Sequence, residues 1–308
     1  MQHLGWDSKV SFTSLPKTAA VARVAELLQM GRRDAIYWSP THRGPLWAHH
    51  HVVSLHDCIN VEYTYRNDWR LPAFRRMFNL VLANAQVVVA LSRATKDAAL
   101  RNYTLEESKI VVIPAGFDIP AETAHATAQA AYTGPPFILM LTNALPHKNT
   151  LRASRAFFGS IAPRNGYVLR VVGSLPPAAL DLSGRDAAKI EVHGHVADAE
   201  LRSWYQSAAF LFSPSLAEGY NLPVAEAIAS GGNVLCSDIA VHREFFDGRA
   251  AFFDPVSEES MVEALNAAVM RAGTRWYPSA SNSRLRSFKD MADDYRAVFR
   301  GIEQEYGR

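Results

Sequence analysis

Residues 210–232 read FLFSPSLAEGYNLPVAEAIASGG, and this stretch contains the succession of elements that decides the fold. Its first three residues, Phe210–Phe212, form a short apolar run that is typical of a buried strand. A helix tolerates Pro223 only in its first turn, so we expect a helix to begin at Leu222 or Pro223. Asn221 stands directly before that start and is a suitable N-cap residue. The stretch therefore predicts a strand, a loop and a helix.

Two glutamates flank the predicted helix start and indicate a ligand site. Glu218 lies in the loop at the carboxyl end of the strand, and Glu226 lies in the first turns of the helix. Gly219 allows a ligand to approach the backbone closely, and the free amides of a helix start favour a phosphate. A nucleotide-sugar carries phosphates and hydroxyls, so one glutamate could hold the ribose and the other the transferred sugar. Either glutamate taken alone is better explained as a solvated surface residue.

Short apolar runs alternate with helical patterns through the whole chain. The runs are rich in Val, Ile, Leu and Phe and mostly non-alternating, which is typical of parallel strands covered on both faces. Strands are expected at Ala35–Trp38, His51–Leu55, Ala85–Leu91, Ile110–Ile113, Phe137–Leu141, Tyr167–Val172, Lys189–Val192, Phe210–Phe212, Asn233–Cys236 and Ala251–Phe253. Helices are expected at Ala19–Met30, Pro72–Leu82, Arg93–Arg101, Asn149–Ser160, Asp198–Ser207 and Val224–Ser230. This order predicts an α/β protein with doubly wound sheets.

The chain is expected to form two Rossmann-like domains, because 308 residues with 48% hydrophobic content suffice for two cores. A small, polar, proline-containing stretch separates the two sets of strands. We therefore expect an N-terminal domain over residues 1–118, a linker over 119–136 and a C-terminal domain over 137–284. Residues 285–308 are predicted to form an amphipathic helix that packs back toward the N-terminal domain. Two such domains facing each other would bind ligands at the carboxyl ends of their strands.

Composition narrows the range of partners. The net charge is +2, and the basic residues do not cluster into a nucleic-acid-binding motif, so no nucleic acid partner is expected. The two cysteines, Cys58 and Cys236, lie in apolar surroundings, which indicates buried free thiols in a reducing compartment. No segment is apolar for long enough to span a membrane, and the N-terminus lacks the pattern of a secretory signal. We therefore expect a cytoplasmic protein.

A second strand–loop–helix succession places basic residues at a helix start. Residues 137–157 read FILMLTNALPHKNTLRASRAF, with His147 and Lys148 at the expected N-terminus and Asn149 beside them. Cations at this end oppose the helix dipole unless an anion lies between them and the helix. A diphosphate leaving group would supply that anion. Lys148 considered alone is equally well explained as an exposed loop residue.

The sequence resembles retaining glycosyltransferases of family 4, which have the GT-B fold. In the first half, the resemblance rests on WSPTHRGPL, VVSLHD, VVVALSRAT and KIVVIPAGFD. In the second half, EGYNLPVAE is similar to the family's motif of two glutamates, and PHKN resembles the basic loop of its mannosyltransferase-like members. EVHGHVADAELRSWYQSAAFLFSPSLAEG and SDIAVHREFFDGRAAFFDP also match. The resemblance extends from about Ala35 to Pro255, and the order of these weakly specific motifs identifies the family.

The resemblance implies catalytic roles for Lys148, Glu218 and His56. Lys148 would neutralise the diphosphate as it leaves, and Glu218 would contact the donor sugar. His56 would lie near that sugar from the other side of the cleft. The family retains anomeric configuration without a metal, and the donor phosphate helps to take the acceptor proton. No side-chain base, metal or cofactor is therefore expected.

The same match implies a donor-binding set. Glu226 would bind the ribose, and the backbone of the residues around the helix start would bind sugar hydroxyls or phosphate. The other members of the set lie in the basic loop and near the base. The whole set is Glu226, Gly219, Tyr220, Asn221, Leu222, His147, Asn143, His195 and Val196.

Several residues depart from the family pattern. Asn221 stands where many members have Gly, and Asn143 stands where many have Arg or Thr. His147 stands where many have Arg, so part of the charge on the phosphate would depend on histidine protonation. Residues 1–34 contain no Gly-x-Gly followed by a helix. We therefore expect the family's first strand and Gly-rich loop to be lacking, with an abbreviated N-terminal domain.

The resemblance implies a retaining hexosyltransferase that uses a nucleoside diphosphate sugar, and the mannosyltransferase-like motifs favour GDP-mannose. The acceptor would be a glycan or a lipid-linked oligosaccharide in surface polysaccharide biosynthesis. One alternative is a catalytically impaired relative that binds a nucleotide-sugar or a partner enzyme without transfer, which a missing Gly-rich loop would favour. Another is an epimerase or hydrolase, which needs a dedicated acid–base pair that the sequence does not display.

Two further patterns each have a functional and a structural explanation. Arg66–Leu82 mixes basic with aromatic residues, which suits a peripheral contact with the cytoplasmic face of a membrane. A helix that covers the sheet is the commoner explanation for such a pattern. His49–His51 and His56 lie close in sequence, but consecutive residues of a strand point apart, and the spacing matches no standard metal site.

Overall fold

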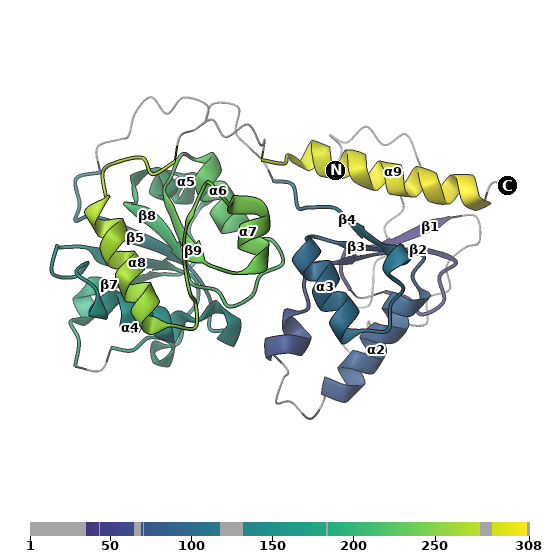
Figure 1. Ribbon diagram of the computed structural model, residues 1–308, viewed down its shortest axis with the longest axis horizontal. Helices are drawn as coiled ribbons and strands as arrows, with labels where there is room; N and C mark the ends of the chain where they lie inside the picture. Colours follow the sequence, from purple (N-terminus) through teal and green to yellow (C-terminus); the bar gives the residue numbers. More distant parts are fainter. Residues whose placement is uncertain are drawn as a thin grey trace. The chain divides into compact units, whose positions relative to one another are not determined.

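The structure is a computed structural model that describes residues 35–42, 44–64, 69, 71–117, 132–182, 184–277 and 285–306. The chain divides into two compact units (Figure 1). The first unit comprises Met1–Gly116 together with Arg286–Arg308, and the second comprises Phe117–Leu285. Each unit contains one parallel sheet, which confirms the predicted α/β class.

Some sequence-based expectations lie outside the described residues. The expected helix Ala19–Met30 and the expected lack of a first strand and a Gly-rich loop both concern residues 1–34. Most of the expected linker, 119–136, falls within residues 118–131, which are also outside the described part of the chain.

The sheet of the first unit has four parallel strands in the order β1-β2-β3-β4. The strands are β1 (Ile36–Ser39), β2 (His50–Leu55), β3 (Val87–Ala90) and β4 (Ile110–Val112). The helices are α2 (Leu71–Asn84), α3 (Arg93–Asn102) and α9 (Phe288–Tyr306), with shorter helical turns at Asn60–Thr64 and Glu107–Lys109.

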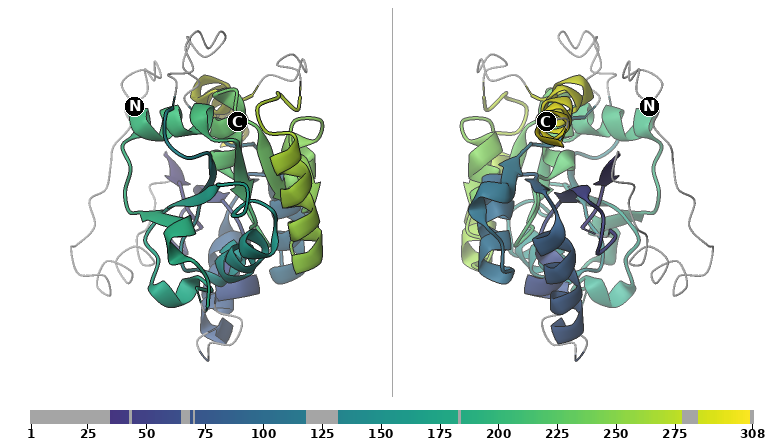
Figure 2. Two further views of the ribbon diagram at one scale, coloured as in Figure 1. Left: turned by 90° about the vertical axis from the view of Figure 1, so that its left-hand side faces the viewer. Right: turned by 90° about the vertical axis from the view of Figure 1, so that its right-hand side faces the viewer.

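Both faces of this sheet are covered by helices. Neighbouring residues of a strand point to opposite faces, so Val52 and Val53 of β2 belong to different cores. Val53 packs in a cluster with Phe78 of α2, whereas Val52 packs in a cluster with Tyr295 and Ile302 of α9. Figures 1 and 2 show α9 along one face and α2 on the other. The last helix of the chain therefore completes the core of the first unit.

Two aromatic rings of α2, within the basic and aromatic segment, pack in the core beside the sheet. Phe78 of α2 is buried, and Phe74 stacks on it with ring centroids 6.2 Å apart. Trp69, by contrast, is 88% exposed. This packing favours the structural explanation of the segment, and the membrane contact stays a prediction. In the described part of the chain, no helix has both the length and the apolarity needed to cross a membrane.

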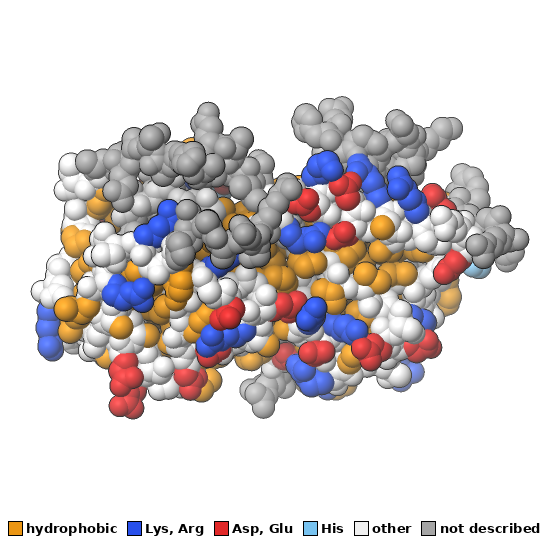
Figure 3. Space-filling model, turned by 45° about the horizontal axis from the view of Figure 1, so that its top comes forward, with side chains coloured by type: hydrophobic (Ala, Val, Ile, Leu, Met, Phe, Trp, Pro, Cys, Tyr) orange, Lys and Arg blue, Asp and Glu red, His pale blue; other side chains and the backbone are white. Residues whose placement is uncertain are grey.

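Charges of both signs are mixed on the face shown in Figure 3. On the face shown in Figure 3, the Lys and Arg side chains of the described residues alternate with Asp and Glu side chains. The described residues form no extended region of one sign on that face. The expectation of no nucleic acid partner stays a prediction.

The sheet of the second unit has six parallel strands in the order β10-β9-β8-β5-β6-β7. The strands are β5 (Phe137–Leu141), β6 (Val168–Val172), β7 (Ile190–His193), β8 (Phe210–Ser213), β9 (Val234–Ser237) and β10 (Ala251–Phe253). The helices are α4 (Thr150–Gly159), α5 (Asp198–Ser207), α6 (Leu222–Ala229), α7 (Ala240–Phe246) and α8 (Glu258–Met270), with 3-10 turns at Pro146–Lys148, Pro177–Ala179 and Ala187–Lys189. This order is that of dinucleotide-binding folds.

The core of the second unit confirms the predicted buried strands. Ile138 and Met140 of β5 are fully buried and pack in one cluster with Phe157 of α4 and Leu265 of α8. The ten predicted strands are all present, with ends shifted by at most two residues. The predictions did not include α7 and α8. Cys58 and Cys236 are buried and free, as expected.

The burial of His51 on β2 generates a prediction about pH. Burial lowers the pKa of His51 from 6.5 to about 4, and its Nε2 atom lies 2.9 Å from Ser39 Oγ. As the pH falls below 6.5, the unfolded chain therefore binds a proton at this site before the folded chain does. We expect the free energy of unfolding to fall by about 3 kcal/mol between these two pKa values because of His51 alone.

Urea unfolding at several pH values checks this prediction. His51→Asn should show a shallower decline in stability over that pH window than the unchanged chain. His49→Asn, at an exposed neighbouring position, is the control and should keep the original decline. Equal declines in the His51 variant and the unchanged chain would contradict the assignment.

The packing of α9 generates a second prediction. Ile302 is 3% exposed and belongs to the core cluster that contains Val52 and Val89. Ile302→Ala removes buried methyl groups and leaves a cavity, so we expect it to lower the free energy of unfolding by about 2–5 kcal/mol. Glu303→Gln, at an exposed position on the same helix, should change it little. Equal stabilities of the two variants would show that α9 does not close this core.

Candidate functional site

The strand order of the second sheet brings two loops to the same edge. β5 pairs in parallel with β8, with Ile138 opposite Phe210, so the carboxyl ends of the two strands are neighbours. From β5 the chain continues to β6 and β7 on one side, and from β8 it continues to β9 and β10 on the other. Ligands of open α/β sheets bind at such a point of reversal. The loops that follow β5 and β8 contain most of the predicted site residues.

The loop after β5 ends in a 3-10 turn and a left-handed residue. The turn spans Pro146–Lys148, and Asn149 then has φ 57° before α4 begins at Thr150. Asn149 Nδ2 donates hydrogen bonds to the carbonyl oxygens of Pro214, at 3.1 Å, and Pro255, at 2.8 Å. One buried asparagine therefore ties together the loops that follow β5, β8 and β10.

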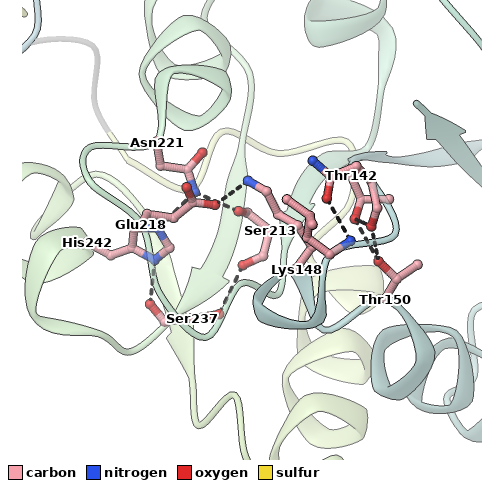
Figure 4. Close-up of polar contacts among 10 residues, drawn as sticks. Thr142, Lys148, Thr150, Ser213, Glu218, Asn221, Ser237 and His242 are labelled. Atoms are coloured by element: carbon pink, nitrogen blue, oxygen red, sulfur yellow. Dashed lines mark hydrogen bonds and ion pairs between the residues drawn. The ribbon is translucent and has the colours of Figure 1, made fainter. Parts of the chain in front are cut away.

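Lys148 forms an ion pair with Glu218. The Lys148 Nζ atom lies 2.6 Å from Glu218 Oε1, and the side chains are only 21% and 11% exposed (Figure 4). The backbone amide of Leu216 also donates to the carbonyl oxygen of His147, at 2.7 Å. A diphosphate was the anion expected to balance this cation, and that contact stays a prediction. The carboxylate of Glu218 already supplies the negative charge.

His147 lies beside Lys148 in the same turn, and its surroundings affect its protonation. Its side chain is buried, and burial together with the Lys148 charge lowers its pKa below the usual value. His147 is therefore neutral near neutral pH. The expected dependence of the phosphate's surroundings on histidine protonation stays a prediction, and the lowered pKa would move it to lower pH.

Asn143 directs its polar groups into its own loop. Its side-chain oxygen accepts a hydrogen bond from the amide of Leu145, at 3.0 Å, and its carbonyl oxygen accepts one from Thr150 Oγ1, at 3.2 Å. Thr142 Oγ1 lies 2.7 Å from Thr150 Oγ1 (Figure 4). Asn143 thus shapes the loop after β5, and its contact with a donor stays a prediction.

Asn221 has a left-handed backbone conformation, and its side chain makes no capping hydrogen bond to α6. Its φ is 80°, and only Asn149 shares a positive φ among the described residues other than glycine. The Asn221 Nδ2 atom donates to Ser213 Oγ, at 2.9 Å, and lies 2.9 Å from His242 Nε2. Asn221 is the N-cap residue of α6, as predicted, but without that capping hydrogen bond. The conformation explains the family's frequent glycine here, because glycine adopts positive φ without steric cost.

Glu226 lies within α6 and is bound by a tyrosine of α5. The Tyr205 hydroxyl donates to Glu226 Oε2 at 3.0 Å. The backbone of Tyr205 also lies close to Gly232. A Cβ atom on Gly232 would lie 2.5 Å from the carbonyl oxygen of Tyr205, so only a glycine allows these two backbones to approach this closely. Burial raises the pKa of Glu226, whereas the hydrogen bond from Tyr205 lowers it. No pattern in the sequence distinguished Tyr205.

Of the remaining residues that were predicted to bind the donor, only some lie at this edge of the sheet. Tyr220 is buried with its ring centroid 4.6 Å from that of Phe245, and Leu222 is partly exposed. His195 and Val196 follow β7, which β6 separates from β5. His195 is exposed and Val196 is buried. Gly219 is buried beside Glu218, so any contact of this residue with a ligand is a backbone contact.

His56 belongs to the first unit. It directly follows β2, is exposed, and its Nε2 atom lies 2.8 Å from the carbonyl oxygen of Pro40. Its predicted place near a donor sugar stays a prediction. Across the described part of the chain, no group of three or more His, Cys, Asp or Glu side chains could hold a metal ion. The expectation of a metal-independent reaction also stays a prediction.

Sequence reasoning did not single out the buried residues behind the loops. His242 of α7 is fully buried, and its Nδ1 atom lies 2.8 Å from the carbonyl oxygen of Ser237. Ser237 Oγ donates to the carbonyl oxygen of Ser213, at 3.2 Å. The histidine in the segment SDIAVHREFFDGRAAFFDP, five residues after the end of β9, is a sequence signal that could have found this group.

Comparisons with known proteins cover both units. The family model described as Glycosyltransferase Family 4 matches residues 11–120, and the one described as Glycosyl transferases group 1 matches residues 135–271. The O-antigen chain mannosyltransferase RfbU of Salmonella typhimurium is 26% identical over 200 residues, which cover 62% of this chain and 53% of RfbU. The chain thus spans about half the length of that relative.

Two further matches cover more of the chain. A D-inositol 3-phosphate glycosyltransferase of an Arthrobacter species is 24% identical over an alignment that covers 90% of this chain and 75% of that protein. The crystal structure of Anabaena HepE in complex with UDP and glucose aligns with a TM-score of 0.65 and 15% identity. It covers 82% of this chain and 72% of HepE. This likeness confirms the predicted GT-B fold.

The Tyr205–Glu226 contact generates a prediction about protonation. Tyr205→Phe removes the hydroxyl that donates to the carboxylate and leaves the burial in place. Because that hydrogen bond lowers the pKa of Glu226, we expect the pKa to rise further in the variant. The ¹³C resonance of the Glu226 carboxyl, followed by NMR as the pH changes, measures the shift. Tyr167→Phe is the matched control, and an unchanged pKa in Tyr205→Phe would contradict the assigned hydrogen bond.

Proposed function

The chain belongs to glycosyltransferase family 4, and on this premise we propose that it transfers a hexose from a nucleoside diphosphate sugar to a glycan or a lipid-linked oligosaccharide. The observation that carries the proposal is the Lys148–Glu218 ion pair at the point where the second sheet reverses its strand order. It places one cation and one carboxylate beside the start of α6. These groups suit a diphosphate and a sugar, respectively.

The charges of the pair suggest how a donor would bind. Without a ligand, Lys148 and Glu218 balance each other. A diphosphate at the start of α6 would draw the Lys148 ammonium toward its own oxygens, and the backbone amides there would add donors. Glu218 would then be free to accept hydrogen bonds from the sugar. When the sugar leaves, the ammonium would stabilise the charge that develops on the diphosphate.

Glu226 suits the ribose in this arrangement. Glu226 lies in the second turn of α6, and the backbone amides that would hold the phosphates lie before it, at the start of the helix. Tyr205 occupies only Oε2 of the carboxylate. The other oxygen and the remaining lone pairs can accept hydrogen bonds from two adjacent hydroxyls.

The proposal also covers the donor sugar, the acceptor and the anomeric configuration of the product. We propose GDP-mannose as the donor, because the PHKN loop is of the mannosyltransferase-like kind and RfbU is named a mannosyltransferase. The name of RfbU also supports an acceptor in surface polysaccharide biosynthesis. We further propose retention of configuration without a metal. A relative that binds without transfer is not favoured, because Lys148, Glu218 and Glu226 are all present.

Release of nucleoside diphosphate from a panel of nucleotide-sugars tests this proposal. GDP-mannose, UDP-glucose and UDP-galactose would each be offered with lipid-linked and free glycan acceptors. We expect one donor to be used, with kcat/KM reduced by about 10²–10³ in Lys148→Ala. Glu226→Gln should mainly raise KM, because the ribose contact is made equally in the ground state and the transition state.

Two matched variants control for the loss of charge alone. Lys189→Ala and Glu263→Gln alter the second unit at positions away from the two loops and should leave kcat/KM unchanged. Binding of a nucleotide-sugar without release under any condition would favour the relative that does not transfer. If the chain neither binds nor releases nucleoside diphosphate from any donor, the proposal is overturned.

A further inference from the structure

A buried histidine lies behind the loop that contains Glu218. His242 of α7 is fully buried and contacts the last residue of β9 and the residue before α6. Its Nδ1 atom lies 2.8 Å from the carbonyl oxygen of Ser237. A carbonyl oxygen only accepts hydrogen bonds, so Nδ1 carries the proton. Nε2 therefore has a lone pair, which accepts from Asn221 Nδ2 at 2.9 Å (Figure 4).

The surroundings of His242 keep its imidazole neutral. Burial lowers its pKa, and the nearby Lys148 charge acts in the same direction. Glu218, Asp238 and the hydrogen bond to Ser237 favour the protonated form, but burial has the largest effect. The neutral form is the one that can accept a hydrogen bond from Asn221 and donate one to Ser237.

Asn221 needs support because of its backbone conformation. With φ 80° it lies in the left-handed region, where any residue with a Cβ atom pays a steric cost. Both hydrogens of its amide group are used, one on Ser213 Oγ and one on His242 Nε2. These two contacts hold the side chain in a fixed direction and so stabilise a backbone that the isolated residue would seldom adopt.

We infer that His242 is a positioning residue of the donor site, which acts by holding Asn221 in its left-handed conformation. This fixes the backbone amides of Gly219–Leu222 in the direction that a donor diphosphate requires. The inference rests on the proposed function, in which those amides bind the donor. In physical terms, the histidine and asparagine together supply the backbone geometry that a glycine would adopt unaided.

A double-variant cycle tests the inference, with GDP and UDP as probes in titration calorimetry. His242→Leu leaves Asn221 without its partner, so we expect it to weaken binding of the better probe by about tenfold. Asn221→Gly adopts the same backbone without the histidine contact and provides the second background of the cycle. In the Asn221→Gly background, His242→Leu should change the dissociation constant by less than about threefold.

Three further measurements separate positioning from a merely structural role. His242→Gln keeps a donor and an acceptor and should lose less affinity than His242→Leu. In the transfer assay, His242→Leu should raise the donor KM more than it lowers kcat. His51→Leu, the same change at an equally buried histidine of the first unit, should leave probe binding unchanged. Circular dichroism confirms that each variant compared is folded.

The outcomes distinguish this inference from the proposed function. Equal weakening by His242→Leu in both backgrounds, or no weakening in the unchanged chain, would overturn the inference alone. Failure of the unchanged chain to bind either probe would overturn the proposed donor site and the inference with it. If His242→Leu does not fold, the same comparison is made with His242→Gln in the two backgrounds.

Discussion

The parallel pairing of β5 with β8 is the constraint on which the candidate site depends. It joins strands from two halves of the second sheet and sets their carboxyl ends side by side. Lys148 follows one strand and Glu218 follows the other, 70 residues later. The amide of Leu216 adds a backbone hydrogen bond between the loops. The juxtaposition of these two residues is therefore a consequence of topology, and together they form an internally neutral ion pair.

Both loops rely on an asparagine with positive φ. Asn149 joins the loops after β5, β8 and β10 through its side-chain amide, and Asn221 joins β8 to α7 in the same way. In each case buried hydrogen bonds offset the cost of the left-handed backbone. Such bonds leave little conformational freedom for a ligand to remove, which is the physical meaning of preorganisation at this site.

The sequence was sufficient to predict features that depend on local chemistry. Buried parallel strands are continuous apolar runs, so the strands of both sheets were predicted closely. Pro223 placed the start of α6, and the succession of motifs identified the family. By contrast, the Lys148–Glu218 pairing joins distant segments, and the burial of His147 depends on what packs over it. Tyr205 and His242 act from neighbouring helices, and their contacts follow only once the strand order fixes which helices are adjacent.

A crystal structure of the chain with a bound nucleoside diphosphate tests the central claim most directly. The account predicts phosphate oxygens within hydrogen-bonding distance of Lys148 Nζ and of the backbone amides of Gly219–Leu222, with the ribose hydroxyls on Glu226. The Lys148–Glu218 distance should lengthen as the ammonium turns toward the phosphates. A diphosphate bound away from both loops, with the ion pair still closed, would contradict the account.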